Sequence, residues 1–377
     1  MTRGLYIAST PMIALAAAGA ARAQGGRARL VLIEDFDLAP RLEALLRAWP
    51  DNPFERIVRL PGRHTEHLRG APDRARGTRM FVTRLRVKRA LRSETMAAIA
   101  ALDADLRPDV VWLGNDRKVE TQYAMHLAAR RTGNPAPGRY LDDGLYTYLG
   151  DVRERRWIRR IDWLVKRMTY GGWWQRAAQA GTTPWIAEAW LAYPDLAPSA
   201  YAAERRRRMP TQWFANRAFL RLSALAAHEF GVPRGLLRTC SGVLVLPHSN
   251  QLRADPGLAA RLRGVVRDAT ADGSALALKY HPREMEPDPG GLLDGGRAIA
   301  LPALLPMELL LPLLPRGSLL VGEGSTALLA AHWLRPDLRV RDLGLSQGGY
   351  AARARAFFAT AGIAMDAPQA GGTSCSP

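Results

Sequence analysis

Three short polar clusters in this sequence carry side chains that could do chemistry on an anionic substrate. Each follows a run of apolar, strand-like residues, and the clusters are Asp142-Asp143-Gly144, His281-Pro282-Arg283 and Ser325-Thr326. In open parallel α/β sheets, ligands bind beyond the carboxyl ends of the strands. Side chains at those ends are therefore candidates for binding or catalysis, and the role of each cluster can be argued separately.

The acidic pair ends a predicted strand over residues 139–141. Successive side chains of a strand point to opposite faces, so only one of Asp142 and Asp143 should face a cleft. A carboxylate in that place can accept the proton of an attacking hydroxyl group. A structural role is the alternative: the pair would form a turn or cap a helix, with Gly144 supplying backbone freedom. The motif by itself favours that alternative.

His281 follows a predicted strand over residues 275–280 and precedes Pro282, which holds the histidine backbone extended. A protonated imidazole beside a phosphate can neutralise charge on a leaving phosphate or give it a proton. Arg283 and Lys279 add positive charge nearby. A lone histidine is more often structural than catalytic, so both a structural and a catalytic role remain possible for His281.

The hydroxyl pair, Ser325 and Thr326, lies where a predicted strand over 318–321 turns into a helix, beside Gly322 and Gly324. Hydroxyl and backbone N–H groups at a helix N-terminus form an anion site. An ordinary Ser/Thr N-cap explains the same residues equally well.

Composition narrows the class of protein. The chain has 377 residues, of which 47% are hydrophobic, which suits two domains of about 150 residues each with sizeable cores. Lys and Arg number 53 against 35 Asp and Glu, and the net charge of +18 predicts an anionic partner.

The cysteines and the known catalytic motifs exclude further classes. The only cysteines are Cys240 and Cys375, which excludes a disulfide scaffold or a cysteine zinc cluster and indicates a reducing compartment. No phosphate-loop, HExxH, EF-hand, GxSxG or clear GxGxxG motif is present, which argues against ATPases, zinc hydrolases, α/β-hydrolases and dehydrogenases.

Strand-like and helix-like segments alternate along two parts of the chain, which predicts an α/β protein with two Rossmann-like domains facing a cleft. The first domain is expected over 1–238, including a basic, Arg/Trp-rich helical insertion over about 153–238. The second is expected over 239–345. A last helix and a disordered tail are expected over 346–377.

Residues 1–24 allow two interpretations. Arg3, an apolar stretch and a small-residue site would make a secretory signal. A strand over 5–8, a turn and a helix opened by Pro11 would instead begin a βαβ unit, and we favour this because Ser9-Thr10-Pro11 interrupts the apolar run and another strand follows promptly. The chain is therefore expected to be cytoplasmic, and no stretch is apolar enough to span a bilayer.

Taken together, the three motifs resemble those of bacterial sialyltransferases, including the lipooligosaccharide and polysialic-acid enzymes. That superfamily is marked by acidic-acidic-Gly, His-Pro and Ser-Ser/Thr motifs, in this order, on two Rossmann-like domains of the GT-B glycosyltransferase type. Thr10-Pro11 resembles its opening turn, and Glu308, in Pro306-Met307-Glu308, falls where the family carries a glutamate that holds the nucleotide ribose. The resemblance spans residues 5–345.

The resemblance implies an inverting, metal-independent transfer of sialic acid or a related nonulosonic acid from a CMP-activated donor to a cell-surface glycan. Asp142 or Asp143 would be the general base, with Asp143 preferred, and His281 would stabilise and protonate the departing phosphate. The remaining donor-site residues would be Pro282, Arg283, Glu308, Ser325 and Thr326. No cofactor or metal is expected, because CMP leaves with one charged phosphate that side chains and a helix N-terminus can stabilise in place of Mg²⁺. Asp35-Phe36-Asp37 has the spelling of a metal-binding loop but is expected to be a strand-end turn.

The basic segment suggests where the positive charge acts. At helical spacing, this segment gives an apolar stripe beside a cationic one. Its residues are Arg153, Arg155, Arg156, Trp157, Ile158, Arg159, Arg160, Ile161, Trp163, Leu164, Lys166 and Arg167. This pattern is typical of a helix at a membrane surface, and would place the protein on the inner face of the cytoplasmic membrane. An anionic glycan or glycolipid acceptor could use the same surface, or the apolar residues could simply be core.

Two other classes of function remain open. Arg205–Arg208 and the net charge would suit a nucleic-acid-binding protein, although the charge is spread along the chain and no recognition module is apparent, so no nucleic acid is expected. A catalytically inactive relative acting in envelope assembly is the other alternative.

Overall fold

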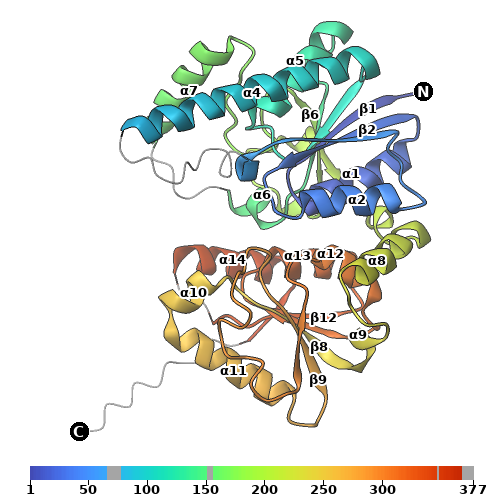
Figure 1. Cartoon of the computed structure of the whole chain (residues 1–377), viewed down its shortest axis with the longest axis vertical. Helices are drawn as coiled ribbons and strands as arrows, with labels where there is room; N and C mark the ends of the chain where they lie inside the picture. The colour runs from blue at the N-terminus through green and yellow to red at the C-terminus, as the bar shows by residue number, and fades with distance from the viewer. Residues whose placement is uncertain (66–77, 151–155, 346–347, 367–377) are drawn as a thin grey trace. The chain divides into compact units, whose positions relative to one another are not determined.

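The computed structural model describes residues 1–65, 78–150, 156–345 and 348–366, without the side chains of 78–85, 88, 156–162 and 256. The chain divides into two compact units, Met1–Leu222 and Ser223–Pro377, coloured blue to green and yellow to red in Figure 1. Each unit is a parallel sheet with helices between its strands, so the predicted pair of Rossmann-like domains is confirmed.

The first unit has a seven-stranded sheet of order β3-β2-β1-β4-β5-β6-β7, in which every neighbouring pair is parallel. Its inner strands are buried on both faces and therefore read as apolar runs. The strands are β1 (Arg3–Ala8), β2 (Arg27–Glu34), β3 (Arg56–Pro61), β4 (Val110–Leu113), β5 (Gly138–Leu141), β6 (Ile186–Leu191) and β7 (Arg206–Arg208). The helices are α1 (Pro11–Gln24), α2 (Ala39–Ala48), α4 (Thr78–Leu106), α5 (Val119–Thr132), α6 (Leu145–Leu149) and α7 (Arg156–Tyr170), with short 3-10 turns η1 (Pro194–Leu196), η2 (Ala203–Arg205) and η3 (Thr211–Trp213).

The segment at the start of the chain folds as the βα interpretation predicts. β1 lies in the middle of the sheet, and α1 is buried from Met12 to Ala21. Thr10 caps α1 by accepting a hydrogen bond from the backbone N–H of Ile13, and Pro11 stands in the first turn, where a missing N–H costs nothing. The alanine-rich face of α1 lets the helix lie close to the strands.

The predicted helical insertion over 153–238 is wrong in part. α7 and α8 (Arg217–Glu229) are helices, but β6 and β7 lie between them and extend the first sheet. Three consecutive arginines form β7 at the edge of the sheet, where charged side chains can reach solvent. Local composition favours no strand there, and pairing with β6 decides the structure.

The second unit has a six-stranded sheet of order β10-β9-β8-β11-β12-β13, again parallel throughout. Its strands are β8 (Cys240–Val245), β9 (Ala275–Lys279), β10 (Ala298–Leu301), β11 (Leu319–Gly322), β12 (Arg339–Asp342) and β13 (Ala364–Met365). The helices after α8 are α9 (Leu236–Thr239), α10 (Ser249–Ala254), α11 (Pro256–Ala269), α12 (Met307–Leu310), the 3-10 turn η4 (Leu311–Leu313), α13 (Thr326–Leu334) and α14 (Gly349–Ala361).

The unit boundary lies at residues 222/223, whereas the sequence predicts 238/239. The boundary falls within α8, so the end of that helix and all of α9, which packs against β8, belong to the second unit. At the other end, α14 and β13 are part of the second unit, since β13 pairs with β12. Most of the predicted tail, 367–377, lies outside the described residues.

Each unit has its own apolar core, centred for example on Ile7 and Val111 in the first and on Leu244 and Leu278 in the second. Among the helices of the described chain, none combines the length and the apolar character that crossing a bilayer requires.

Candidate functional site

The two predicted acidic residues of the first unit have different environments. Asp142, 2% exposed, accepts hydrogen bonds from the backbone N–H groups of Gly144 (2.8 Å) and Ala192 (2.9 Å) and from the Tyr148 hydroxyl. Burial raises the pKa of Asp142, although these donors oppose the shift. Both of its oxygens are occupied within the protein, so Asp142 holds the loop after β5 in place.

Asp143, the next residue of the same loop, is half-buried. Its Oδ1 accepts a 2.8 Å hydrogen bond from the Thr10 hydroxyl, and its backbone N–H donates to Thr147 Oγ1 at 3.1 Å. Gly144 has a φ of +79°, a conformation that permits the sharp turn into α6 and favours glycine. The carboxyl ends of β1 and β5 therefore bring Thr10 and Asp143 together.

The acidic loop after β2 is engaged in ion pairs. Asp35 pairs with Lys118 and accepts a hydrogen bond from the Arg63 backbone N–H, and Asp37 lies 2.7 Å from His64 Nδ1. The strand-end turn expected for Asp35-Phe36-Asp37 is what the structure has. No group of three or more His, Cys, Asp or Glu side chains gathers as a metal site within the residues the structure covers.

In the second unit, the sheet order places the carboxyl ends of β9, β8 and β11 next to one another. His281 follows β9, and Ser325 and Thr326 follow β11. These predicted residues thus lie along the same edge of the sheet, with the end of β8 between them.

His281 is held in a defined tautomer. Its Nδ1 accepts a 3.1 Å hydrogen bond from the backbone N–H of Arg283, so the proton of the neutral ring is on Nε2. Burial, with Arg283, His248 and Lys279 adding positive charge, lowers the pKa of His281 to about 4. In the ligand-free protein near pH 7 the ring is therefore a neutral Nε2–H donor. Pro282 and Arg283 are exposed beside it.

Ser325 is the N-cap of α13, as the structural alternative predicts: its Oγ accepts a hydrogen bond from the Ala327 backbone N–H at 3.2 Å. The preceding Gly324 donates its N–H to Asp342 Oδ1 at 2.9 Å. Burial, helped by the nearby Glu323, raises the pKa of Asp342 to about 6. The carboxyl groups of Asp342 and Glu323 therefore lie near this turn. Their negative charge disfavours a bound anion there, and protonation of Asp342 reduces that effect.

Glu308 and Lys279 are both buried and interact electrostatically. Lys279, at the end of β9, is 4% exposed and donates from Nζ to the carbonyl groups of Ala303 (2.6 Å) and Tyr280 (3.1 Å). Burial lowers the pKa of Lys279 to about 8, while the charge of Glu308 opposes the shift; burial raises the pKa of Glu308. The sequence motif places Glu308 in α12, and the structure adds its cationic neighbour.

One residue of this edge is missed by the sequence analysis. His248 follows β8, the strand between β9 and β11, and its ring centroid is 5.2 Å from that of His281. The sequence does contain a signal for His248, because this histidine, like His281, closely follows a buried apolar strand. However, no family motif marks His248, and the order of the chain does not reveal that β8 lies between the two predicted clusters.

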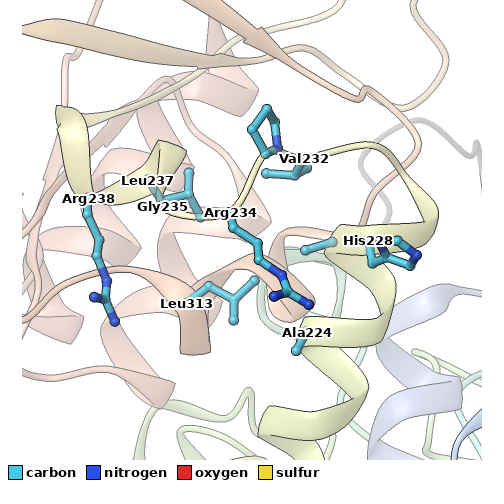
Figure 2. Close-up of a pocket in the computed structure, with 10 residues that line it drawn as sticks. Ala224, His228, Val232, Arg234, Gly235, Leu237, Arg238 and Leu313 are labelled. Atoms are coloured by element: carbon cyan, nitrogen blue, oxygen red, sulfur yellow. The ribbon is translucent and has the colours of Figure 1, made fainter.

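A cavity of about 440 Å³ lies elsewhere in this unit, at the amino end of β8. Figure 2 shows Arg234 and Arg238 extending beside Leu313, with His228 on α8 across from them. Because β8 runs from this cavity toward His248, the cavity and the predicted residues lie at opposite ends of the strand.

Solved structures with a similar architecture include UDP-GlcNAc 2-epimerase from Methanocaldococcus jannaschii, at 10% identity and a TM-score of 0.53, over 97% of this chain and 89% of that chain. They also include the α/β-galactoside α-2,3-sialyltransferase from the luminous marine bacterium Photobacterium phosphoreum, at 11% identity and a TM-score of 0.53, over 96% and 95%. No protein-family model and no curated protein matches the chain. The likeness is one of fold, and it confirms the GT-B type of architecture.

Proposed function

We propose that this protein is an inverting, metal-independent glycosyltransferase that moves sialic acid or a related nonulosonic acid from a CMP-linked donor to a glycan. The observation that carries the proposal is the placement of the sequence motifs at the carboxyl ends of parallel strands in both units. Among them, Asp143 carries a half-buried carboxylate that can accept a proton, and His281 is a neutral Nε2–H donor.

Asp143 is the proposed general base. Its carboxylate takes the proton of the acceptor hydroxyl as that oxygen attacks the anomeric carbon of the donor sugar. A new carbon–oxygen bond forms on one face, while the bond to the CMP phosphate oxygen breaks on the other, and the electron pair leaves with CMP. Thr10 fixes the carboxylate through the 2.8 Å hydrogen bond to Oδ1, and the buried Asp142 supports the loop.

The leaving phosphate is proposed to bind at the edge formed by β9 and β11. The Nε2–H of His281 and the hydroxyl groups of Ser325 and Thr326 would donate hydrogen bonds to it, with the α13 N-terminus adding favourable electrostatics. A bound phosphate would raise the pKa of His281 from its value of about 4, because a nearby negative charge favours the imidazolium. Proton delivery to CMP would thus begin only once the donor is bound.

The remaining donor contacts follow the sequence resemblance. Glu308 would accept hydrogen bonds from the ribose hydroxyl groups. The positive charge of Lys279 favours the ionised carboxylate, against the burial that raises the pKa of Glu308. Pro282 holds His281 in place, and Arg283 adds a fixed charge. Because CMP leaves with a single phosphate, these groups could replace a metal ion.

The test is incubation with CMP-sialic acid and a glycan or lipid extract, followed by mass spectrometry of the products. We expect products heavier by one nonulosonic acid residue, formed at least about a hundredfold more slowly with Asp143→Asn. In parallel, the shift of the thermal unfolding midpoint is measured with CMP, with UDP and with DNA. Stabilisation by UDP alone would favour a UDP-sugar enzyme, and a salt-sensitive response to DNA alone a nucleic-acid-binding protein. Binding of CMP with no transfer to any acceptor would favour the inactive relative.

We also propose that α7 recruits the enzyme to an anionic membrane surface carrying a glycolipid acceptor. Leu164, Val165 and Met168 of this helix are 52%, 55% and 78% exposed, so the interpretation of Leu164 as core is wrong. Lys166 and Arg167 flank them, and α7 lies beside α4 in Figure 1, joined to it by Arg92 and Tyr170. Apolar side chains among cations suit a lipid headgroup region. The residues at the start of the predicted basic stripe, 153–155, lie outside the described structure.

A further inference from the structure

The carboxyl end of β8 lies between the two clusters proposed to bind the donor phosphate. The sheet order is β9-β8-β11, with Leu244 paired to Leu278 on one side and to Val321 on the other. A phosphate that contacts both the residue after β9 and those after β11 must therefore pass over the end of β8. The side chain found there is His248.

His248 and His281 are held by the same local geometry. Each ring accepts a hydrogen bond at Nδ1 from the backbone N–H two residues later: His248 from Asn250 and His281 from Arg283, both at 3.1 Å. The neutral ring of each therefore carries its proton on Nε2, directed away from its own turn. Both rings are half-buried, and their planes meet edge to face at 73°.

Glu284 ties the two turns together. Its Oε2 accepts the Ser249 N–H at 2.9 Å, and Oε1 accepts the N–H groups of Met285 and Glu286. Burial alone would raise the pKa of Glu284, but these donors outweigh burial and lower the pKa to about 2. The carboxylate thus stays ionised and fixes the turn after β8 against the turn after β9. The spacing of the two imidazoles is built into the fold.

We propose that His248 is a second phosphate-binding residue, which together with His281 presents two Nε2–H donors to the phosphate group of the nucleotide donor. The ring centroids lie 5.2 Å apart, so hydrogen bonds of about 2.9 Å from the two rings can reach different oxygens of one phosphate. This inference rests on the proposed function, because it takes the phosphate of that reaction as its ligand.

Because Nδ1 of His248 serves the turn and Nε2 is the proposed phosphate donor, substitutions can test the two nitrogen atoms separately. Asn in its place keeps an acceptor near the Nδ1 position, and so keeps the cap of α10, but has no donor at the Nε2 position. Gln keeps a donor near the Nε2 position. The matched control is His228→Ala, an exposed histidine on α8 that lines the cavity at the opposite end of β8.

The experiment measures binding of CMP and of cytidine, which lacks the phosphate, by calorimetry. We expect His248→Asn to weaken CMP binding about tenfold or more and to leave cytidine binding unchanged, since only the phosphate contact is lost. His248→Gln should recover part of the CMP affinity, and His228→Ala should bind both ligands like the wild type. An equal loss for both ligands, or no loss for either, would overturn the role of His248.

Imidazole ¹⁵N spectra of the histidine-labelled protein separate this inference from the proposed function. If CMP raises the titration midpoint of both His248 and His281, the pair binds phosphate. A shift for His281 alone rejects the role of His248 and leaves the proposed function standing. If CMP does not bind at all, the proposed donor is wrong, and a titration with inorganic phosphate then decides whether the imidazole pair is an anion site by itself.

Discussion

The hydroxyl of Thr10 donates a 2.8 Å hydrogen bond to Oδ1 of Asp143, a residue 133 positions later in the chain. The contact exists because β1 and β5 both flank β4 and their carboxyl ends meet at one edge of the sheet. Thr10 also caps α1, so a single hydroxyl group connects helix capping to the orientation of the proposed base. This linkage leads to two predictions.

The first concerns the two carboxylates. Asp143→Asn should lower kcat by about 10²- to 10⁴-fold with a thermal midpoint close to that of the wild type, because the proposed proton acceptor is lost while the loop is kept. Asp142→Asn should instead lower the free energy of unfolding by about 1–3 kcal/mol, since its NH₂ group cannot accept from the buried donors. Kinetics with thermal unfolding check both. A stable but inactive Asp142 variant beside an active Asp143 variant would reverse the assignment.

The second concerns Thr10 itself. Thr10→Val keeps the shape but removes the hydroxyl, so the free energy of unfolding should fall by about 1–2 kcal/mol through loss of the cap. The rate of transfer should also fall, with KM for the donor little changed, because the carboxylate loses its positioning contact. Thr10→Ser is the control and should restore both. Normal kinetics in the valine variant would remove Thr10 from the site.

The third is a pH dependence of stability. The pKa of His281 is lowered to about 4 from an ordinary value of 6.5, chiefly by burial. As the pH falls below about 6.5, the unfolded chain takes up this proton before the folded protein does, so the folded state loses stability down to about pH 4; above pH 6.5 the ring contributes nothing.

His281→Asn keeps an acceptor for the Arg283 N–H and removes the titration. Relative to the wild type, the variant should therefore gain up to about 3 kcal/mol of unfolding free energy between pH 7 and pH 4. Urea denaturation at stepped pH measures the difference, and a pH-independent difference would contradict this prediction.

The proposed catalytic role of His281 is tested separately in the transfer assay, where His281→Ala should abolish activity while CMP still binds measurably.

The fourth tests Glu308 as the ribose ligand. The wild type should bind CMP more tightly than 2′-deoxy-CMP, and Glu308→Gln should reduce that preference by weakening binding of CMP selectively. Because the substitution leaves Lys279 buried beside a neutral side chain, thermal unfolding must be measured alongside. An unchanged preference for CMP in a folded variant would show that Glu308 does not contact the 2′-hydroxyl group.

The fifth tests membrane recruitment. Met168→Asp should reduce co-sedimentation with vesicles containing anionic lipid at physiological salt by about tenfold or more, because a charge replaces an exposed apolar side chain. Met285→Asp is the matched control, since Met285 is 88% exposed in the second unit and should have no effect. If the wild type ignores anionic vesicles, α7 is not a membrane anchor.

The class of fold and the position of the motifs at the ends of strands could be predicted from the amino-acid sequence. Short apolar runs such as residues 30–33 and 243–246, bounded by glycine, proline and capping residues, indicate buried strands. Asp143, His281 and Ser325 follow such runs in the sequence and stand just after β5, β9 and β11 in the structure.

The order of the strands in each sheet and the partners of individual side chains could not be predicted in this way, because they depend on contacts between distant segments. β8 lies between β9 and β11 although it precedes both in the chain, and that order alone brings His248 to His281. In the same way, Asp142 accepts hydrogen bonds from Tyr148 and Ala192 while Asp143 accepts one from Thr10, and Arg206–Arg208 becomes a strand by pairing with β6. These outcomes depend on contacts between segments distant in sequence, whose free energies outweigh the local preferences of the residues involved.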